Sequence, residues 1–134
     1  MKLNPYIMFN GSTEQAFNFY KEVFNGEITA MQRYGDVEMP GTENCKQLIM
    51  HAILKFDDNT LMASDYKPED EVVNQSNIHL SIDIMEVFIL EDTFNKLAQG
   101  GTITMPLQDT FWGARFGMIK DKFGINWMLN CDLN

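Results

Sequence analysis

Apolar residues recur along this chain with two periods, and each period predicts one kind of secondary structure. From Ala16 to Phe24, and again from Val87 to Ala98, they return every three or four positions, as on one face of a helix. Elsewhere apolar and polar residues alternate, which is typical of strands with one covered face. Asn25-Gly26 and Gly100-Gly101 follow the helical stretches and indicate where both helices end.

Each predicted helix is preceded by two residues with the spacing of a capping box. In a capping box, two side chains at the start of a helix bond backbone amides that have no partner within the helix. The pairs are Ser12 with Gln15 and Asp83 with Glu86. We therefore expect local side-chain caps on both helices.

The order β-α-β-β-β occurs twice along the chain, which indicates a repeat. Because about 65 residues alone bury a small core, we expect one α+β domain, residues 1–134, made of two modules. These modules span about 1–65 and 77–134 and are joined by the loop 66–76. The predicted strands cover residues 5–9, 27–34, 48–56, 60–64, 78–82, 102–107, 114–120 and 125–131.

Alternation also predicts which side of each strand faces its helix. In the strand 78–82, Ile78, Leu80 and Ile82 are expected to pack beneath the helix. The opposite faces of the strands are mixed, and they carry polar residues beside methionines. Such a mixed face is typical of a curved sheet that lines a small-molecule cup, and the alternative is a plain solvent-exposed face. On this face, the candidate ligand-binding residues are His51, Asn77, His79 and Met128.

Composition narrows the classes of partner. Ten Lys and Arg against nineteen Asp and Glu give a net charge of −9 and a pI near 4.5, which argues against nucleic acid or an anionic membrane as the partner. Two cysteines are too few for a disulfide framework or a four-cysteine metal site. The start of the chain lacks the apolar core of a signal peptide, and no stretch approaches the roughly 20 apolar residues that span a bilayer. We therefore expect a cytoplasmic protein.

Several segments together resemble a known family. They are NPYIMFNG, EQAFNFYKEVF, RYGD, IMHAIL, LMASD and LAQGGTITMPLQDTFWGARFGMIKDKFGINWM. They resemble the PhnB-like branch of the glyoxalase/bleomycin-resistance/dihydroxybiphenyl-dioxygenase superfamily, the vicinal oxygen chelate proteins. The resemblance runs from Asn4 to Asn130 and is most specific between Met105 and Trp127. It implies two βαβββ modules that form open half-barrels, assembled as a homodimer with cups between modules.

The resemblance also bears on metal binding. Catalytic members of the superfamily hold a divalent ion with His, Gln or Glu at four strand positions. Carried over to this chain, those positions fall at Pro5, Met62, Asn77 and Met128. Proline offers no side-chain donor and a thioether is a poor ligand for magnesium, manganese or zinc. We therefore expect a cup without a metal, and no cofactor.

Three further side chains are candidates for chemistry. Arg115 lies among aromatic residues, where a guanidinium can bind a carboxylate or phosphonate, or can form a structural salt bridge. Trp112 is a candidate lid over the cup, or a packing residue. His51 is the best candidate for a general base, with Ser64 or Asp65 as its partner.

Two classes of function therefore stay open. The first is binding of a small organic molecule, with an anion among the candidates, by His51, Asn77, His79, Trp112, Arg115 and Met128. The second is catalysis, either by a metal-dependent lyase, isomerase or dioxygenase with atypical ligands or by a metal-free enzyme. The methyltransferase label often attached to this branch is not expected to describe the activity. Methyl transfer from S-adenosylmethionine usually needs a glycine-rich turn, and the turn after the first strand has one glycine, Gly11.

Overall fold

The computed structural model describes residues 1–73 and 75–134, and the chain divides into two compact units, Met1–Val72 and Val73–Asn134. Of the predicted connecting loop, residue 74 lies outside the described residues. Neither helix in the described part of the chain is long and apolar enough to cross a membrane.

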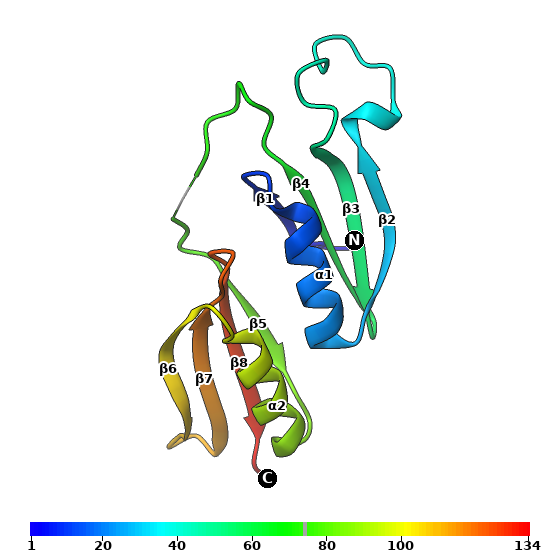
Figure 1. The fold of residues 1–134 in the computed structure, drawn as a ribbon. Helices are drawn as coiled ribbons and strands as arrows, with labels where there is room; N and C mark the ends of the chain where they lie inside the picture. The colour runs from blue at the N-terminus through cyan, green and yellow to red at the C-terminus, as the bar shows by residue number, and fades with distance from the viewer. Residues whose placement is uncertain (74) are drawn as a thin grey trace. The chain divides into compact units, whose positions relative to one another are not determined.

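The first unit is a four-stranded sheet with one helix on one face (Figure 1). The strands lie in the order β1-β4-β3-β2; β1 pairs with β4 in parallel, and the other pairs are antiparallel. The helix α1 packs against β2, β3 and β4. The elements are β1 (Tyr6–Phe9), α1 (Thr13–Phe24), β2 (Glu27–Arg33), the 3-10 helix η1 (Tyr34–Asp36), β3 (Ile49–Phe56) and β4 (Asn59–Asp65).

The second unit repeats this plan. Its strands lie in the order β5-β8-β7-β6, β5 pairs with β8 in parallel, and α2 packs against β7 and β8. The elements are β5 (His79–Asp83), α2 (Val87–Leu97), β6 (Thr102–Asp109), β7 (Ala114–Lys120) and β8 (Asn126–Asp132). Two βαβββ units with open sheets confirm the predicted fold class.

Alternation places the core of each unit between sheet and helix, as predicted. Ala52 and Leu54 of β3 are buried, and so are Trp127 and Leu129 of β8. The helices contribute Ala16, Phe17, Tyr20 and Val23 in α1, and Leu90, Phe94 and Leu97 in α2. Burying each large apolar side chain contributes about 1.5–3 kcal/mol, so this layer supplies much of each unit's stability.

Both predicted capping boxes are wrong. Ser12 is the N-cap of α1 without a side-chain hydrogen bond; instead, the Thr13 amide donates to Asp65 Oδ1 at 3.0 Å. The N-cap of α2 is Glu86, again without a side-chain bond, because the chain stays extended through Asp83 in β5. A distant carboxylate at the end of β4 therefore replaces the local cap in the first unit.

Several strand boundaries differ from the predicted ones by one or two residues, and at Ile78 the difference changes a predicted core residue. Ile78 was expected to pack beneath the second helix, but β5 begins one residue later, at His79, and Ile78 is exposed. The ends of the helices agree better with the sequence. Asn25 adopts the left-handed conformation (φ 52°) directly after α1, and Gly100 (φ 74°) follows α2.

Candidate functional site

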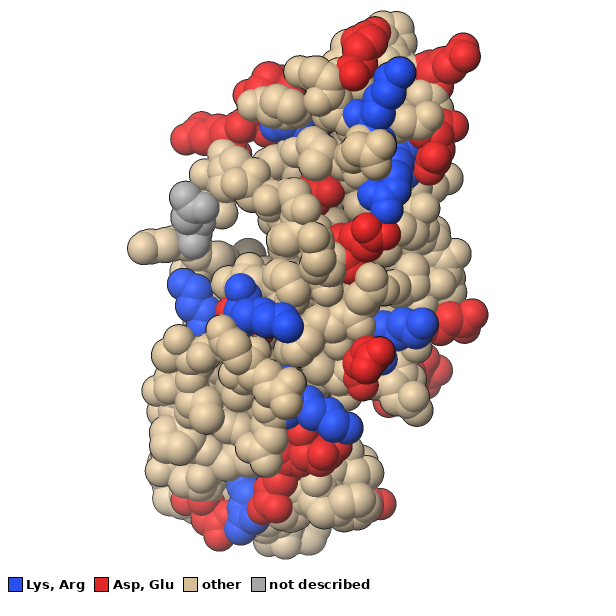
Figure 2. Space-filling view, in the orientation of Figure 1, with Lys and Arg blue, Asp and Glu red and all other residues tan. Residues whose placement is uncertain are grey.

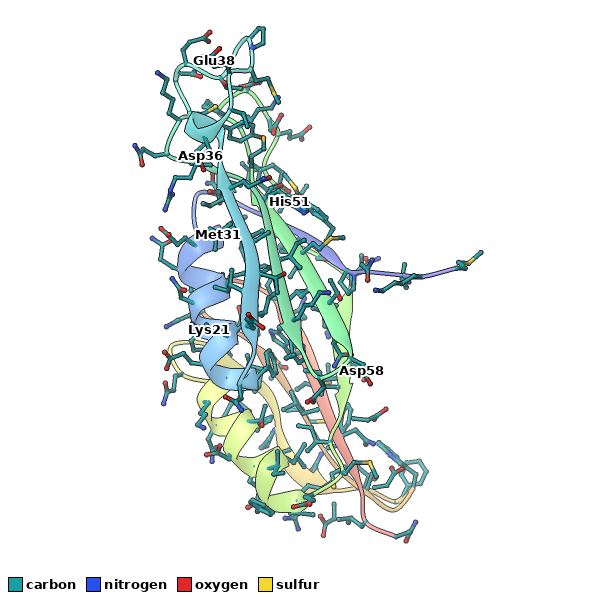
Figure 3. All side chains as sticks on the ribbon, turned by 90° about the vertical axis from the view of Figure 1, so that its right-hand side faces the viewer. Lys21, Met31, Asp36, Glu38, His51 and Asp58 are labelled. Atoms are coloured by element: carbon teal, nitrogen blue, oxygen red, sulfur yellow. The ribbon has the colours of Figure 1, made fainter. Side chains whose placement is uncertain are left out.

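The face of each sheet that is turned away from its helix is called here the open face. On the open face of the first unit, strand register places Tyr6, Met62, Ile53 and Ala30 in one row across β1, β4, β3 and β2. In the next row, Met8 pairs with Ser64. Figure 3 shows His51 on the side of the sheet away from α1.

The open face of the second unit has the same plan with different side chains. Its middle row consists of Ser81, Met128, Met118 and Met105. Polar rows lie on both sides of this thioether row: one contains Asp83, Asn130, Phe116 and Gln108, and the other contains His79, Asn126, Lys120 and Thr102. Each unit therefore has an apolar middle row with polar neighbours on the same face.

The most specific contact on either open face joins Tyr6 and His51. The Tyr6 hydroxyl lies 2.9 Å from His51 Nδ1, and the two rings stack with centroids 5.7 Å apart and planes 24° apart. The two side chains come from β1 and β3, so they meet over β4, the strand between them. Tyr6 is 45% exposed and His51 is half-buried, so this polar pair is open to solvent.

Tyr6 is a site residue that sequence reasoning missed. The predicted partners of His51 have other contacts: Ser64 donates to Met8 Sδ at 3.1 Å, and Asp65 accepts from the amides of Thr13 and Ile49. Alternation in β1 puts Tyr6 on the open face. Its neighbour across the sheet depends on the parallel pairing of β1 with β4, which no local pattern indicates.

The other predicted residues of the open face lie in the second unit. His79 is exposed and pairs in register with Asn126. Met128 is half-buried in the middle row beside Ser81. Asn77 is exposed and precedes β5.

Arg115 lies on the other side of the second sheet. Its Nη1 donates to Glu91 Oε1 of α2 at 2.7 Å, and its Nε donates to Asp109 Oδ1 of β6 at 2.8 Å. Its register partner on β8 is Cys131, which is buried on the helix side. The geometry favours a structural salt bridge, the second of the two interpretations of this guanidinium.

The salt bridges shift the pKa values of their members. The hydrogen bond from Arg115 lowers the pKa of the Asp109 carboxyl, and the same bond raises the pKa of Arg115. In the first unit, Arg33 donates to Glu14 Oε2 at 2.6 Å, and this bond raises the pKa of Arg33. Both arginines thus have carboxylate partners from a helix of their own unit.

Trp112 lies in the turn between β6 and β7. It is 55% exposed, and its ring meets those of Phe111 and Phe116 edge to face, with centroids 5.0 and 5.9 Å away. Phe116 belongs to the open face, so the aromatic turn borders that face. On the view of Figure 2, charged side chains of both signs are interspersed, and an uncharged area lies over β6 and β7.

Three of the four positions that the superfamily uses for a divalent metal hold donors of the wrong kind. Pro5 offers its backbone carbonyl, which accepts the Met62 amide at 3.0 Å. Met62 and Met128 offer thioethers, which suit soft ions rather than magnesium, manganese or zinc. Within residues 1–73 and 75–134, no three His, Cys, Asp or Glu side chains form a group that could hold a metal ion. These donor sets do not fit a hard or borderline divalent ion.

In a comparison with protein families, the chain matches the model described as 3-demethylubiquinone-9 3-methyltransferase over residues 1–130. Among curated proteins, the chain is similar to protein YjdN of Escherichia coli, with 32% identity over 142 residues, which cover 97% of this chain and 95% of that protein. Both matches extend over nearly the whole chain.

Solved structures are also similar to this chain over nearly its whole length. Protein PA1353 of Pseudomonas aeruginosa is 39% identical, with a TM-score of 0.91 over 98% of both chains. A PhnB protein of Bacillus cereus is 28% identical, with a TM-score of 0.82 over 98% of this chain and 99% of that one. A glyoxylase/bleomycin resistance protein/dioxygenase domain from Frankia is 12% identical, with a TM-score of 0.69 over 98% of this chain and 92% of that one, a likeness of fold alone.

Proposed function

This chain belongs to the 3-demethylubiquinone-9 3-methyltransferase family, in the PhnB-like branch of the glyoxalase/bleomycin-resistance/dioxygenase superfamily, and from this membership we propose that it binds a small organic molecule. The molecule binds in a cup lined by the open face of the first unit's sheet. We assign its polar contacts to Tyr6 and His51.

The hydrogen-bonded pair of Tyr6 and His51 carries this proposal. Small-molecule sites are mostly apolar, with a few well-placed polar groups that orient the ligand. Around the pair, the open face offers the thioethers of Met8 and Met62 and the side chain of Ile53. Methionine adapts its shape to irregular apolar ligands, so this face supports binding of an organic molecule with at least one polar group.

The methyl transfer in the family's description is not part of the proposal. Nucleotide-like cofactors usually bind where a glycine-rich turn joins a strand to a helix and backbone amides surround the phosphates or the ribose. Here β1 and α1 are joined through Gly11, the single glycine of the turn. The strand that follows α1 is also antiparallel to its neighbour β3, unlike the parallel sheet of a doubly wound fold.

A metal-free enzyme is the second candidate, and one observation favours it. His51 has an orienting partner in Tyr6, as a catalytic histidine requires. In this alternative, His51 removes a proton from a bound substrate. Metal-dependent lyase, isomerase or dioxygenase chemistry would need ligands other than those at the four superfamily positions.

We also propose that the chain is a cytoplasmic homodimer, as the family resemblance implies. The exposed apolar side chains of Met85, Phe88 and Ile89 at the start of α2 support a second copy as the partner, because such groups are usually covered in an assembly. Light scattering tests the oligomeric state, and cell fractionation tests the location.

Thermal unfolding tests the binding function, because a ligand of the native state raises the apparent Tm. Carboxylates, phosphonates, quinones and thiol conjugates are added one by one to the wild type, to His51→Gln and to the matched variant His79→Gln. We expect at least one organic compound to raise the wild-type Tm, with a smaller rise in His51→Gln. No rise with any compound would overturn the proposal.

The same assay separates the alternatives. Mn²⁺, Ni²⁺ and Zn²⁺ are expected to leave the Tm unchanged, since the donor sets do not suit them. A rise that EDTA reverses would instead favour the metal-dependent enzyme. Arg115→Ala is included because the ligand-anchor interpretation predicts a lost response, whereas a structural salt bridge predicts a lower Tm with the response retained.

A further inference from the structure

We propose that Tyr6 fixes the tautomer of His51, so that the Nε2–H group of the ring is the donor that binds an oxygen atom of the ligand. The ligand is then an organic molecule with an oxyanion, such as a carboxylate or a phosphonate. This inference rests on the proposed binding function and adds the chemical class of the ligand. Tyr6 acts as a positioning residue, because it sets the state of the group that meets the ligand.

The first step of the argument is the hydrogen bond itself. A neutral imidazole has one N–H donor and one acceptor nitrogen, so a ring that accepts at Nδ1 carries its proton at Nε2. The Tyr6 hydroxyl lies 2.9 Å from His51 Nδ1, which is a normal hydrogen-bond distance. A phenol is a stronger donor than a neutral imidazole N–H, so we assign the hydroxyl as the donor.

The second step is the geometry around the ring. Near-parallel stacking of the two rings, with centroids 5.7 Å apart, restricts how the His51 side chain can turn. In the described part of the chain, the ring has one hydrogen bond, at Nδ1, which leaves Nε2 for a ligand. His51 is half-buried on the open face, so part of its side chain is open to solvent.

The third step is the chemistry of the surrounding face. Gln32, the register partner of His51 on β2, adds amide donors. Among the described strands, no register partner of either member of the pair is a carboxylate. His51 pairs with Gln32, and the row of Tyr6 contains Met62, Ile53 and Ala30. The described side chains around the pair thus offer hydrogen-bond donors and no carboxylate acceptor. This face therefore favours a ligand whose own oxygen atoms accept the hydrogen bonds.

Nitrogen-15 NMR of the histidine rings tests the tautomer directly, because protonated and unprotonated ring nitrogens resonate far apart. Spectra of the neutral rings are compared for the wild type, Tyr6→Phe and the control Tyr66→Phe, and His79→Gln identifies the His51 signals. We expect His51 to carry its proton at Nε2 in the wild type and in Tyr66→Phe, and Tyr6→Phe to give a mixture of tautomers. A proton at Nδ1 in the wild type would overturn the proposal and favour His51 as a base.

Titration with methylphosphonate and with benzoate tests the ligand class, with chloride at equal ionic strength as the control. We expect both anions to shift the Nε2 signal of His51. Tyr6→Phe removes the hydrogen bond to His51. We expect this loss to raise the Kd of both anions by about tenfold. Because His51→Gln has no His51 signal, its binding is followed by the rise in Tm, which we expect to be lost. The control Tyr66→Phe is expected to keep both the signal shift and the rise in Tm.

The outcomes distinguish this inference from the function on which it rests. If neither anion shifts Nε2 but an uncharged aromatic compound raises the Tm, the oxyanion assignment is wrong and the binding function stands. If no organic compound raises the Tm, both fail. Circular dichroism of Tyr6→Phe, which keeps the stacked ring, verifies that a lost response does not come from unfolding.

Discussion

At the scale of single residues, each unit has a buried carboxylate that accepts several hydrogen bonds. Asp65 is 2% exposed and accepts from the amides of Thr13 and Ile49. Asp121 is 4% exposed and accepts from the Phe123 and Ile125 amides and from Trp127 Nε1. A buried donor that loses its partner costs about 1–3 kcal/mol, so these two aspartates stabilise the fold rather than serve a ligand.

Asp65→Ala tests this role in the first unit. We expect the free energy of unfolding to fall by about 3 kcal/mol, because two amides lose a charged acceptor. Urea unfolding followed by circular dichroism measures the change. Glu38→Ala is the control: Glu38 is exposed (Figure 3), and its removal is expected to change stability by less than about 0.5 kcal/mol. Equal losses in both variants would contradict the structural role of Asp65.

Asp109 gives a prediction for pH. Its hydrogen bond from Arg115 lowers its pKa in the folded state, so the ionised form is favoured by folding. The resulting contribution to stability is present above the ordinary pKa of an aspartate and is lost as the pH falls through the lower folded-state value.

Unfolding curves of the wild type and of Asp109→Asn, measured between neutral pH and pH 3, follow this contribution. We expect the variant to lose less stability on acidification than the wild type. Asp92→Asn, which removes the exposed pair with Lys96, is the control. Identical acid profiles for wild type and Asp109→Asn would rule out the proposed coupling.

At the scale of elements, the sequence predicted what depends on neighbours in the chain. The burial of Ala52 and Leu54 and of Trp127 and Leu129 follows from alternation, and the left-handed Asn25 follows from its place after a helical stretch. The caps failed because the acceptor for the start of α1 comes from the end of β4, 52 positions along the chain. Local spacing cannot reveal an acceptor that tertiary packing supplies.

The contact of β7 with α2 gives a prediction at this scale. A Cβ on Gly117 would lie 2.6 Å from Phe94 Cε2 and 3.0 Å from Leu107 Cδ2. We expect Gly117→Ala to lower the free energy of unfolding by about 1–3 kcal/mol through overpacking, although alanine is usually preferred to glycine within a strand.

A second variant verifies the cause. Adding Phe94→Leu to Gly117→Ala makes room beside the new methyl group, so the loss in the double variant is expected to be smaller than the sum of the two single losses. Urea unfolding of all four proteins measures this coupling. Additive losses would mean that the helix contact is not the source of the effect.

At the scale of the whole molecule, the repeat was readable because both halves use the same order of elements. The candidate site was harder to predict from the sequence. His51 was predicted on the open face, but its partner Tyr6 meets it across an intervening strand, which requires the sheet order. Arg115 is similar: its neighbours in sequence left a ligand anchor and a structural salt bridge both open, because its partners Glu91 and Asp109 come from two other elements.

Assembly gives the prediction at this scale. For a chain of 15.5 kDa, we expect light scattering to report twice this mass. Phe88, which is 68% exposed on α2, is expected to contribute to the interface, so Phe88→Glu shifts the equilibrium toward the single chain. Glu71→Lys, an exposed change outside the helices and strands, is the control. A wild type of single-chain mass at micromolar concentration would refute the dimer.

The parallel pairing within each unit has a consequence for synthesis on the ribosome. The first strand of each sheet has a single neighbour, which is the last strand of the same unit: β4 for β1 and β8 for β5. Met8 and Ser64, which face each other in this pairing, are 56 positions apart. During synthesis, β1 therefore cannot pair with a neighbouring strand until most of its unit has been translated. The sheet of each unit is complete only after its final strand has emerged from the ribosome.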